Sequence, residues 1–429
     1  MIEKNQQSQL LEMQKYLANR QSQLLQMQGE IEKDYCHLQP TQANVIHENA
    51  QQTSKHNEQC INFEKEPINI KGSDLTVDEK RLLVISRLQA SKICEMLGNN
   101  PWKLISNSPY DICENPCISI IITLFNYSEY IYECLDSVSK SDIADLPGDI
   151  EILVIDDCST DNSATLVEEY LLESNLPICL IRKLFNTGLA DARNLGLKLA
   201  RSPYVFILDA DNWIYPNCLT VLYNSIKSSN YAAVYGEISR FDNETKKEIN
   251  RISCYEWDVH KLVKQPYIDA MAMFNKDMVL KVGGYSTELI EYGWFGWDDY
   301  DLWLKLAQFN YTCKFVQKVL SAYRVHGLSM INTTNKYTVN LTKYFHIKFA
   351  DLIKKYKSSD MVFGFYESQI YSSTDSQAQQ RVNKSELQEL HQAYAIITAM
   401  QSSKFWQLRN NWFKLKKFLG LAKDVDVKI

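Results

Sequence analysis

Two aspartates, Asp209 and Asp211, stand on either side of one small residue in the stretch FILDADNWIY, residues 206–215. The apolar run before them predicts a buried strand, and alternate residues of an extended chain share a face. The two carboxylates therefore point the same way and repel each other unless a cation lies between them. Mg²⁺ or Mn²⁺, held by this D-x-D pair and completed by substrate phosphates, would meet that need. The alternative is a turn in which Asp209 only caps the next few residues.

A second acidic pair, Asp156 and Asp157, follows another apolar run in IDDCSTD, residues 155–161. A carboxylate in this position could accept hydrogen bonds from a nucleobase or a ribose. Whatever the function, we expect Ser159, Thr160 or Asp161 to cap the next helix.

Arg193 lies in FNTGLADARNLGLKLA, residues 185–200, where a glycine precedes an expected helix. In the first turns of that helix, its guanidinium and the helix N-terminus could together bind a diphosphate. Arg193 could equally pair with one of the nearby aspartates, and the sequence leaves both interpretations open.

A third acidic cluster, EYGWFGWDDYDLWLKL at residues 291–306, is rich in aromatic residues. Aromatic faces suit sugar rings, so Trp294 and Trp297 are candidate acceptor contacts, and a carboxylate among them could act as a general base. The alternative is that Asp298 or Asp299 caps a helix while tryptophans fill the core, which is the interpretation we favour for Asp301 and its neighbour Trp303.

His326 follows an expected strand in YRVHGLSM, residues 323–330. A single histidine is more often structural than a ligand. Beside an incomplete metal site, however, it could join Asp209 and Asp211 as a third ligand.

The elements that position these residues alternate between short apolar runs and amphipathic segments. Continuously apolar strands with helical crossovers predict an α/β fold with a parallel sheet covered on both faces. In such sheets ligands bind at the carboxyl ends of the strands, where all four aspartates of the first two pairs fall. The expected strands are 117–125, 151–157, 177–184 and 204–211, and the expected helices lie near 129–139, 163–172 and 190–200.

The rest of the chain divides into appendages. Heptad spacing of leucines predicts a coiled-coil helix over 1–35, which either forms a homo-oligomer through 7–34 or stays a single helix. We expect a flexible linker over 36–75, a helical connector over 76–110, the α/β domain over 111–345 and a helical C-terminal region over 346–429. Within the last, a basic amphipathic helix over 404–423 either contacts an anionic membrane or packs back on the domain.

Composition narrows the classes of partner and compartment. A net charge of −6 gives no overall attraction to nucleic acid, so we expect no nucleic-acid partner. The eleven cysteines are odd in number and scattered, which is typical of reduced thiols rather than a zinc set. The first residues lack the apolar core of a signal peptide, and no apolar run reaches the roughly 18 residues of a membrane span. We therefore expect a cytoplasmic protein, with peripheral membrane contact only through 404–423.

Taken in order, the motifs resemble the inverting glycosyltransferases of family 2, which have the Rossmann-like, nucleotide-sugar-binding GT-A fold, and among them the bacterial cell-surface polysaccharide type. The resemblance covers about 117–330, through ISIIITLFNYSEYIYECLDSV, EILVIDDCSTDNS, NTGLADARNLGLKLARSPYVFILDADN, KVGGYS, GWDDYDLWLKL and YRVHGLSM. It implies that Asp209 and Asp211 bind the metal and diphosphate, that Asp299 activates the acceptor, and that His326 resembles a histidine that completes metal or phosphate contacts in some relatives. Donor contacts are expected at Thr123, Phe125, Asn126, Asp157 (the nucleobase), Arg193 and Asp209.

The sequence departs from relatives at two positions. Asp298 precedes Asp299 where relatives often have Glu-Asp, so the base could be either aspartate. Cys158 stands where relatives often have glycine.

We therefore expect a metal-dependent transferase that moves a sugar from a nucleoside diphosphate, with a UDP-sugar as the expected donor, to a hydroxyl of a glycan or lipid-linked acceptor. One alternative is a nucleotidyltransferase, although TLFNYSE after the first strand lacks the Gly-rich, basic loop of that class. The other is a catalytically silent scaffold that acts through the coiled coil and the basic tail.

Overall fold

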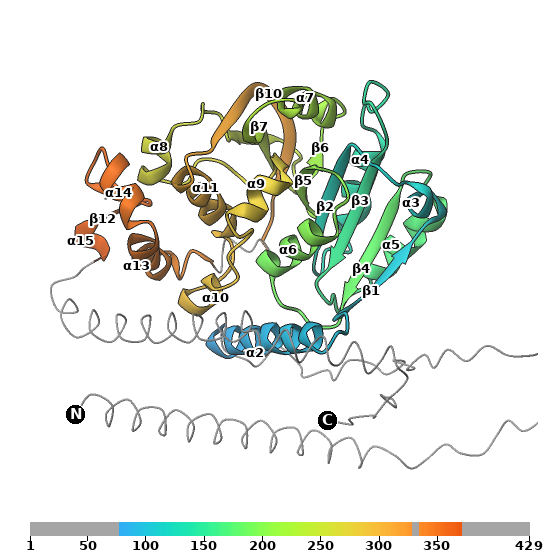
Figure 1. Ribbon diagram of the computed structural model, residues 1–429, viewed down its shortest axis with the longest axis horizontal. Coiled ribbons are helices and arrows are strands. Elements are labelled where there is room, and N and C mark those ends of the chain that lie inside the picture. The colour runs from blue at the N-terminus through green and yellow to red at the C-terminus, as the bar shows by residue number, and fades with distance from the viewer. Residues whose placement is uncertain (1–76, 328–333, 371–429) are drawn as a thin grey trace, which may run out of the picture. The chain divides into compact units, whose positions relative to one another are not determined.

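The computed structural model describes residues 77–327 and 334–370 (Figure 1). The expected coiled coil over 1–35, the linker over 36–75 and the basic helix over 404–423 lie outside the described residues. Among the residues that are described, no helix combines the length and the apolar character needed to cross a membrane.

A mixed ten-stranded sheet forms the centre of the fold, in the order β1-β4-β3-β2-β5-β9-β7-β10-β6, with β8 paired to β7. Strands β2, β3, β4 and β5 are parallel neighbours, as the apolar runs predict, whereas β1 and β9 run antiparallel to β4 and β5. The strands are β1 (Trp102–Ser106), β2 (Ile118–Leu124), β3 (Ile150–Asp156), β4 (Ile178–Lys183), β5 (Tyr204–Asp209), β6 (Trp213–Ile214), β7 (Tyr231–Asp242), β8 (Glu248–Ile252), β9 (Met273–Asn275) and β10 (Thr312–Val325).

Helices cover both faces of this sheet. Every residue of β2 and β3 is buried, and alternate residues enter different cores: Ile121 packs in one hydrophobic cluster, Ile120 and Ile122 in the other. The helices are α2 (Val77–Met96), α3 (Ser108–Ile112), α4 (Ile131–Ser139), α5 (Ser163–Glu173), α6 (Leu189–Leu199), α7 (Cys218–Ile226), α8 (Val259–Lys264), α9 (Lys276–Lys281), α10 (Leu289–Tyr292), α11 (Asp298–Gln308), α13 (Thr338–Lys348), α14 (Ala350–Tyr356) and α15 (Glu367–Ile370).

The α/β fold and its expected strands and helices are confirmed, with differences at both ends of the described region. The segment 76–110 was expected to be helical, yet after α2 it forms β1, which extends the sheet through pairing with β4. In the region expected to be helical after 346, α14 and α15 are separated by a hairpin of β11 (Met361–Val362) and β12 (Phe365–Tyr366). The division of the chain into domains stays a prediction.

Candidate active site

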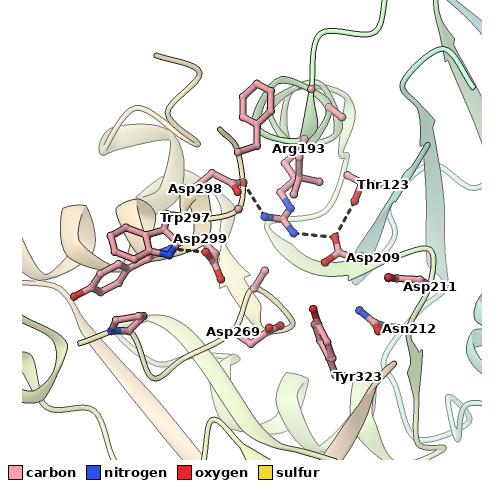
Figure 2. A pocket seen from close by; sticks show the side chains of 18 of the residues that line it. Thr123, Arg193, Asp209, Asp211, Asn212, Asp269, Trp297, Asp298, Asp299 and Tyr323 are labelled. Carbon is pink, nitrogen blue, oxygen red and sulfur yellow. Dashed lines mark hydrogen bonds and ion pairs between the residues drawn. The ribbon is translucent and has the colours of Figure 1, made fainter. Parts of the chain in front are cut away.

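A cavity of about 930 Å³ opens where the carboxyl ends of β2, β3 and β5 meet the start of α11 (Figure 2). Every site residue predicted from the sequence lines it except His326, which lies beside it. The lining includes Thr123, Phe125, Asn126, Asp157, Arg193, Asp209, Asp211, Trp294, Trp297, Asp298 and Asp299. The fold therefore brings predicted site residues from as far apart as 123 and 299 in the sequence to one cavity.

Arg193 joins two of the acids in this cavity. Its Nη2 donates a hydrogen bond to Asp209 Oδ1 at 2.8 Å, and its Nη1 donates to Asp298 Oδ2 at 2.8 Å. Thr123 Oγ1 donates to the same Asp209 oxygen at 2.9 Å. Burial by itself would lower the pKa of Arg193, but Asp209 and Asp298 raise it well above its usual value. Of the two open interpretations of Arg193, pairing with an aspartate is the one that the structure shows.

Asp298 and Asp299 have different surroundings although they are adjacent. Asp298 is completely buried and paired with Arg193. Asp299 is half-buried, lines the cavity, and accepts a hydrogen bond from the backbone N–H of Tyr300 at 2.7 Å. Burial, and then the charges of Asp298 and Asp269, raise the pKa of Asp299 well above its usual range. Of this pair, Asp299 is thus the more exposed carboxylate and the one without a cation partner in the described residues, and its role as the base stays a prediction.

Asp211 and His326 form a contact at the other side of the cavity. Asp211 is 6% exposed, and its Oδ2 lies 2.9 Å from His326 Nε2. Burial raises the pKa of Asp211, the bond from His326 opposes this, and the neighbouring Asp209 raises it further. The rings of Tyr127 and Tyr130 pack against the imidazole, with centroids 5.8 and 5.1 Å away.

Arg324, which sequence reasoning missed, supports the turn that carries Asp211. Its Nε donates to the backbone oxygen of Asp211 at 2.8 Å, and its backbone N–H donates to Asn212 Oδ1 at 2.9 Å. The guanidinium is buried and also pairs with Glu133. An arginine in an otherwise buried stretch of β10 was the signal that could have revealed it.

The acids beside β5 suit a divalent cation, although the described residues hold no ready cluster of three ligand-type side chains. Burial and the charge of Asp209 both disfavour the ionised form of Asp211, so a cation beside it would be stabilising. The side-chain bonds of Asp209 within the described residues use Oδ1, which leaves Oδ2 for a ligand, and His326 faces Asp211 with Nε2, the nitrogen that could exchange this contact for a metal. Magnesium and manganese are commonly held by one or two carboxylates plus phosphates, so this set of donors fits.

Asp157, where a nucleobase contact was expected, binds the protein backbone in the structure. Asp157 Oδ2 accepts the N–H of Gly188 at 2.7 Å, and its Oδ1 accepts the N–H of Thr187 at 3.0 Å and pairs with Lys183 at 2.8 Å. Gly188 has φ 91°, and an added Cβ would collide with the ring of Phe295. Asp157 therefore fixes the loop that starts α6, and its contact with a nucleobase stays a prediction.

The loop after β3 is also tied together by side chains. Asn126, with φ 56°, accepts the N–H of Thr160 through Oδ1 at 2.7 Å, and Asp161 Oδ1 accepts the N–H of Ser163 at 3.0 Å. The N-cap residue of α5 is Asn162, which makes no side-chain capping bond, so of the three residues expected to cap this helix only Asp161 contacts its start. Cys158 has φ 64°, a conformation that glycine adopts more easily than other residues.

The two tryptophans expected to contact an acceptor differ in exposure. Trp297 is 7% exposed and packs against the rings of Tyr300 and Phe345, with centroids 5.5 and 5.7 Å away. Trp294 is half-buried and lines the cavity. Trp297 is therefore largely a core residue, and Trp294 is the better placed of the two.

Two further residues that line the cavity belong to none of the sequence motifs. Asp269 lies in the loop between α8 and β9, and its pKa is raised to about 6 by burial and by the charges of Asp209 and Asp211, against the effect of Arg193. Val84, from helix α2, also lines the cavity. The segment expected to be only a connector thus contributes a wall of the site.

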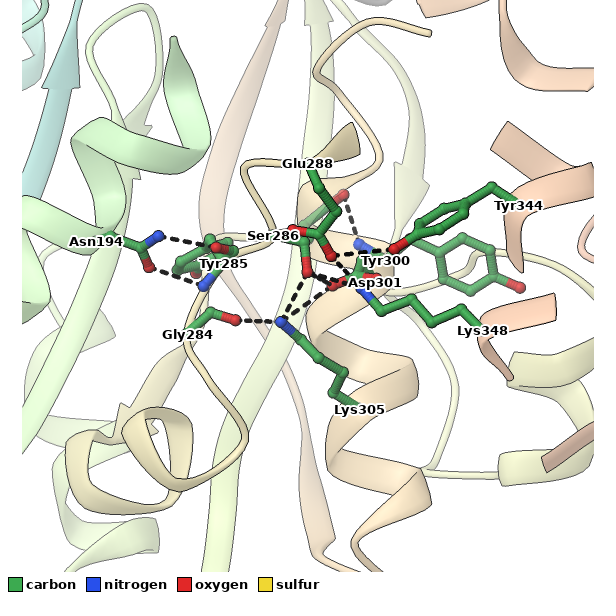
Figure 3. A network of polar contacts seen from close by, with 11 residues as sticks. Asn194, Gly284, Tyr285, Ser286, Glu288, Tyr300, Asp301, Lys305, Tyr344 and Lys348 are labelled. Atoms are coloured by element: carbon green, nitrogen blue, oxygen red, sulfur yellow. Dashed lines mark hydrogen bonds and ion pairs between the residues drawn. The ribbon is translucent and has the colours of Figure 1, made fainter. Parts of the chain in front are cut away.

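Helix α11 is anchored by a buried ionic network on its far side (Figure 3). Asp301, completely buried, pairs with Lys348 at 2.6 Å and Lys305 at 3.1 Å and accepts a hydrogen bond from Ser286 Oγ at 2.5 Å. Lys348, from α13, also pairs with Glu288 at 2.9 Å. The network fixes the helix whose first turn carries Asp299.

Residues 119–283 match the sequence model described as glycosyl transferase family 2. Residues 119–283 thus form a glycosyltransferase domain of family 2. The resemblance to family 2, the GT-A fold and the assignment as an enzyme are thereby confirmed, whereas the inverting mechanism and the polysaccharide type stay predictions.

Individual proteins that resemble this glycosyltransferase match only in part. Glycosyltransferase GlyG of Streptococcus pneumoniae is 24% identical over 155 residues, which is 36% of this chain and 50% of GlyG. Chondroitin synthase of Escherichia coli is 26% identical over 251 residues, 57% of this chain and 34% of that protein. The chain thus spans half or less of the length of these two relatives.

Among solved structures, the mannosyltransferase PcManGT from Pyrobaculum calidifontis, in complex with GDP-Man and Mn²⁺, superposes with a TM-score of 0.42 at 20% identity. The superposition covers 64% of this chain and 76% of the mannosyltransferase.

Proposed function

We propose that this domain transfers a sugar from a nucleoside-diphosphate donor, expected to be a UDP-sugar, to a hydroxyl of a glycan or lipid-linked acceptor with inversion at the anomeric carbon. The proposal is carried by one cavity that holds a rim of acids at Asp209 and Asp211 and, across from it, the carboxylate of Asp299, which pairs with no cation among the described residues. One side suits a cation with a diphosphate, and the other suits a hydroxyl that must lose its proton.

The reaction is a single displacement. The acceptor oxygen forms a bond to the anomeric carbon as the bond from that carbon to the diphosphate oxygen breaks. Asp299 takes the proton of the acceptor hydroxyl, and the nucleoside diphosphate leaves with the electrons of the broken bond. Because attack comes from the side opposite the leaving group, the anomeric configuration inverts.

Residues on the donor side would bind the leaving group. Asp211, Asp209 and His326 would hold Mg²⁺ or Mn²⁺, which when bound supplies positive charge against the diphosphate. Arg324 keeps the Asp211 turn in place, and Arg193 keeps Asp209 in place through its bond to Oδ1. Manganese accompanies GDP-Man in the complex of PcManGT, so it is the first metal to test.

The acceptor side of the proposal rests on two observations. The name of one relative, chondroitin synthase, points to a polysaccharide, and the exposed part of Trp294 offers an aromatic face in the same cavity. A cytoplasmic location, with peripheral membrane contact by 404–423, belongs to the same proposal.

Thermal stabilisation of the purified protein tests the donor side without knowledge of the acceptor. UDP, GDP and their sugars would be added with Mn²⁺, Mg²⁺ or a chelator, and the melting temperature measured. We expect one diphosphate series to raise it in a metal-dependent way, and Asp211→Asn to abolish the rise. Asp277→Asn, an exposed aspartate outside the cavity, is the matched control. No stabilisation by any of these ligands at millimolar concentration would favour the scaffold instead.

A further inference from the structure

Asp269 is an acid that neither the motifs nor the proposed reaction uses. It lies in the loop between α8 and β9, and its backbone N–H is fixed by Ser253 Oγ at 3.0 Å. Its Oδ1 accepts the N–H of Met271 at 3.0 Å, which holds the side chain in one orientation. Its Oδ2 has no hydrogen-bond partner within 77–327 or 334–370, and the residue lines the cavity.

Asp269 lies between the two sides of the proposed reaction. Figure 2 shows its carboxylate beside the ring of Tyr323, with Asp299 on one side and the Asp211 rim beyond that ring on the other. The electrostatics agree, because the charge of Asp269 acts on Asp299 while the charges of Asp209 and Asp211 act on Asp269. The anomeric carbon must also lie between the diphosphate and the base, so the transferred sugar would occupy the space that Asp269 faces.

An acceptor atom held in such a place needs a donor when a ligand displaces water. A buried polar oxygen left without a partner is costly, and sugars offer several hydroxyl donors. No cation pairs with Asp269 in the described part of the chain, whereas Arg193 pairs with Asp209 and Asp298. A neutral hydroxyl of the ligand is the partner that this geometry lacks.

We propose that Asp269 holds the transferred sugar, with its free Oδ2 accepting a hydrogen bond from one hydroxyl of that sugar. This assignment rests on the proposed function, since it requires a nucleotide sugar in the cavity. It makes Asp269 a residue that selects the donor sugar, distinct from the acids that bind the diphosphate and from the base.

The test compares the binding of a nucleotide sugar with the binding of its nucleoside diphosphate. Titration calorimetry with Mn²⁺ would measure UDP against UDP-N-acetylglucosamine, and GDP against GDP-mannose, for wild type, Asp269→Asn and Asp269→Glu. We expect both variants to bind the diphosphate as wild type does and to lose about 10- to 100-fold in affinity for the nucleotide sugar, because hydrogen bonds to charged groups are strong. Asp277→Asn should change neither affinity.

The outcomes separate the two proposals. If wild type binds a diphosphate and its sugar but both variants keep the wild-type ratio of affinities, Asp269 does not hold the sugar. An equal loss for diphosphate and nucleotide sugar would also overturn the assignment, since Asp269 would then act on the diphosphate side. If wild type binds none of the four ligands, the proposed function fails and this inference fails with it.

Deoxy sugars identify the hydroxyl. Wild type should lose affinity for the donor that lacks the contacted hydroxyl, and Asp269→Asn should bind that donor and the parent sugar equally. A loss of the same size in wild type and variant for every deoxy donor would contradict the contact.

Discussion

Asp298 and Asp301 differ from Asp299 in burial and in charge partners, although all three lie in the first turn of helix α11. The first two are completely buried, and each is matched by cations: Asp298 by Arg193, and Asp301 by Lys305 and Lys348. Asp299 faces the cavity and has no cation partner in the described residues, and Asp269, across the same cavity, has none either.

This contrast separates acids that hold the structure from acids that await a ligand. A buried charge without a partner is costly, so a fold that places one must gain by it elsewhere. Groups whose pKa is displaced by burial and by like charges, at the wall of a cavity, are typical of functional sites. Matched acids should thus be needed for stability, and unmatched acids should be needed for activity at some cost in stability.

The largest expected effect comes from Asp299→Asn. The amide cannot take a proton from the acceptor hydroxyl, so turnover should fall about 10²- to 10⁴-fold while donor binding is kept. Sugar transfer measured at saturating donor, together with calorimetry of donor binding, checks this. A rate close to that of wild type would mean that Asp298, or no side chain of this pair, is the base.

Lys348→Met should give the largest loss of stability. It leaves Glu288, whose pKa Lys348 holds down at about 2 against the effect of burial, without its cation. Breaking a buried pair by removing one partner costs about 3–5 kcal/mol, and we expect the lower end because Lys305 still pairs with Asp301 and the side chain of Glu288 is 33% exposed. Urea denaturation measures the free energy of unfolding. A loss of under about 1 kcal/mol would mean that buried acids paired with cations are not needed for stability.

Asp269→Asn should act in the opposite direction and make the protein more stable at neutral pH. The pKa of Asp269 in the folded protein, about 6, lies above its ordinary 3.8, so folding is favoured when the group is protonated. That contribution is complete below pH about 4 and is lost as the pH rises through about 6, leaving a cost of about 1–3 kcal/mol at pH 7.

Melting curves at pH 4 and pH 7 measure this difference directly. The gain in melting temperature of Asp269→Asn over wild type should be small at pH 4 and should reach its full size near pH 7. Asp277→Asn, whose carboxylate is exposed, should show no such trend. If the variant were less stable than wild type at pH 7, Asp269 would contribute to stability, as the acids paired with cations are expected to do.

Much of the fold and of the site could be predicted from local sequence. The apolar runs of β2, β3 and β5 identify buried parallel strands, and the acids that follow them then fall at one edge of the sheet. The aspartates that begin α11 were found because they are interleaved with aromatic residues in 291–306, where a carboxylate could act as a general base. Such signals need only neighbouring residues.

Contacts between distant residues could not be predicted in the same way. The second partner of Arg193, Asp298, lies 105 residues away, and nothing near either residue specifies that pairing. Asp269 belongs to no motif, because what distinguishes it is the cavity that other elements form around it. Strand β1 was missed since its pairing with β4 depends on the sheet already being present.

The smallest expected effect, from Lys140→Met, shows whether burial or pairing underlies the comparison. Lys140 pairs with Asp136 at 2.5 Å, but the two side chains are 70% and 39% exposed, whereas those of Lys348 and Asp301 are 18% and 0% exposed. Water and salt screen an exposed pair, so the same substitution should shift the melting temperature by less than about 1 °C. If Lys140→Met and Lys348→Met lowered stability equally, the pairing itself would carry the energy. The lack of a cation partner would then affect stability equally at exposed and at buried positions. Burial in the cavity would no longer distinguish Asp299 and Asp269 from unpaired acids on the surface.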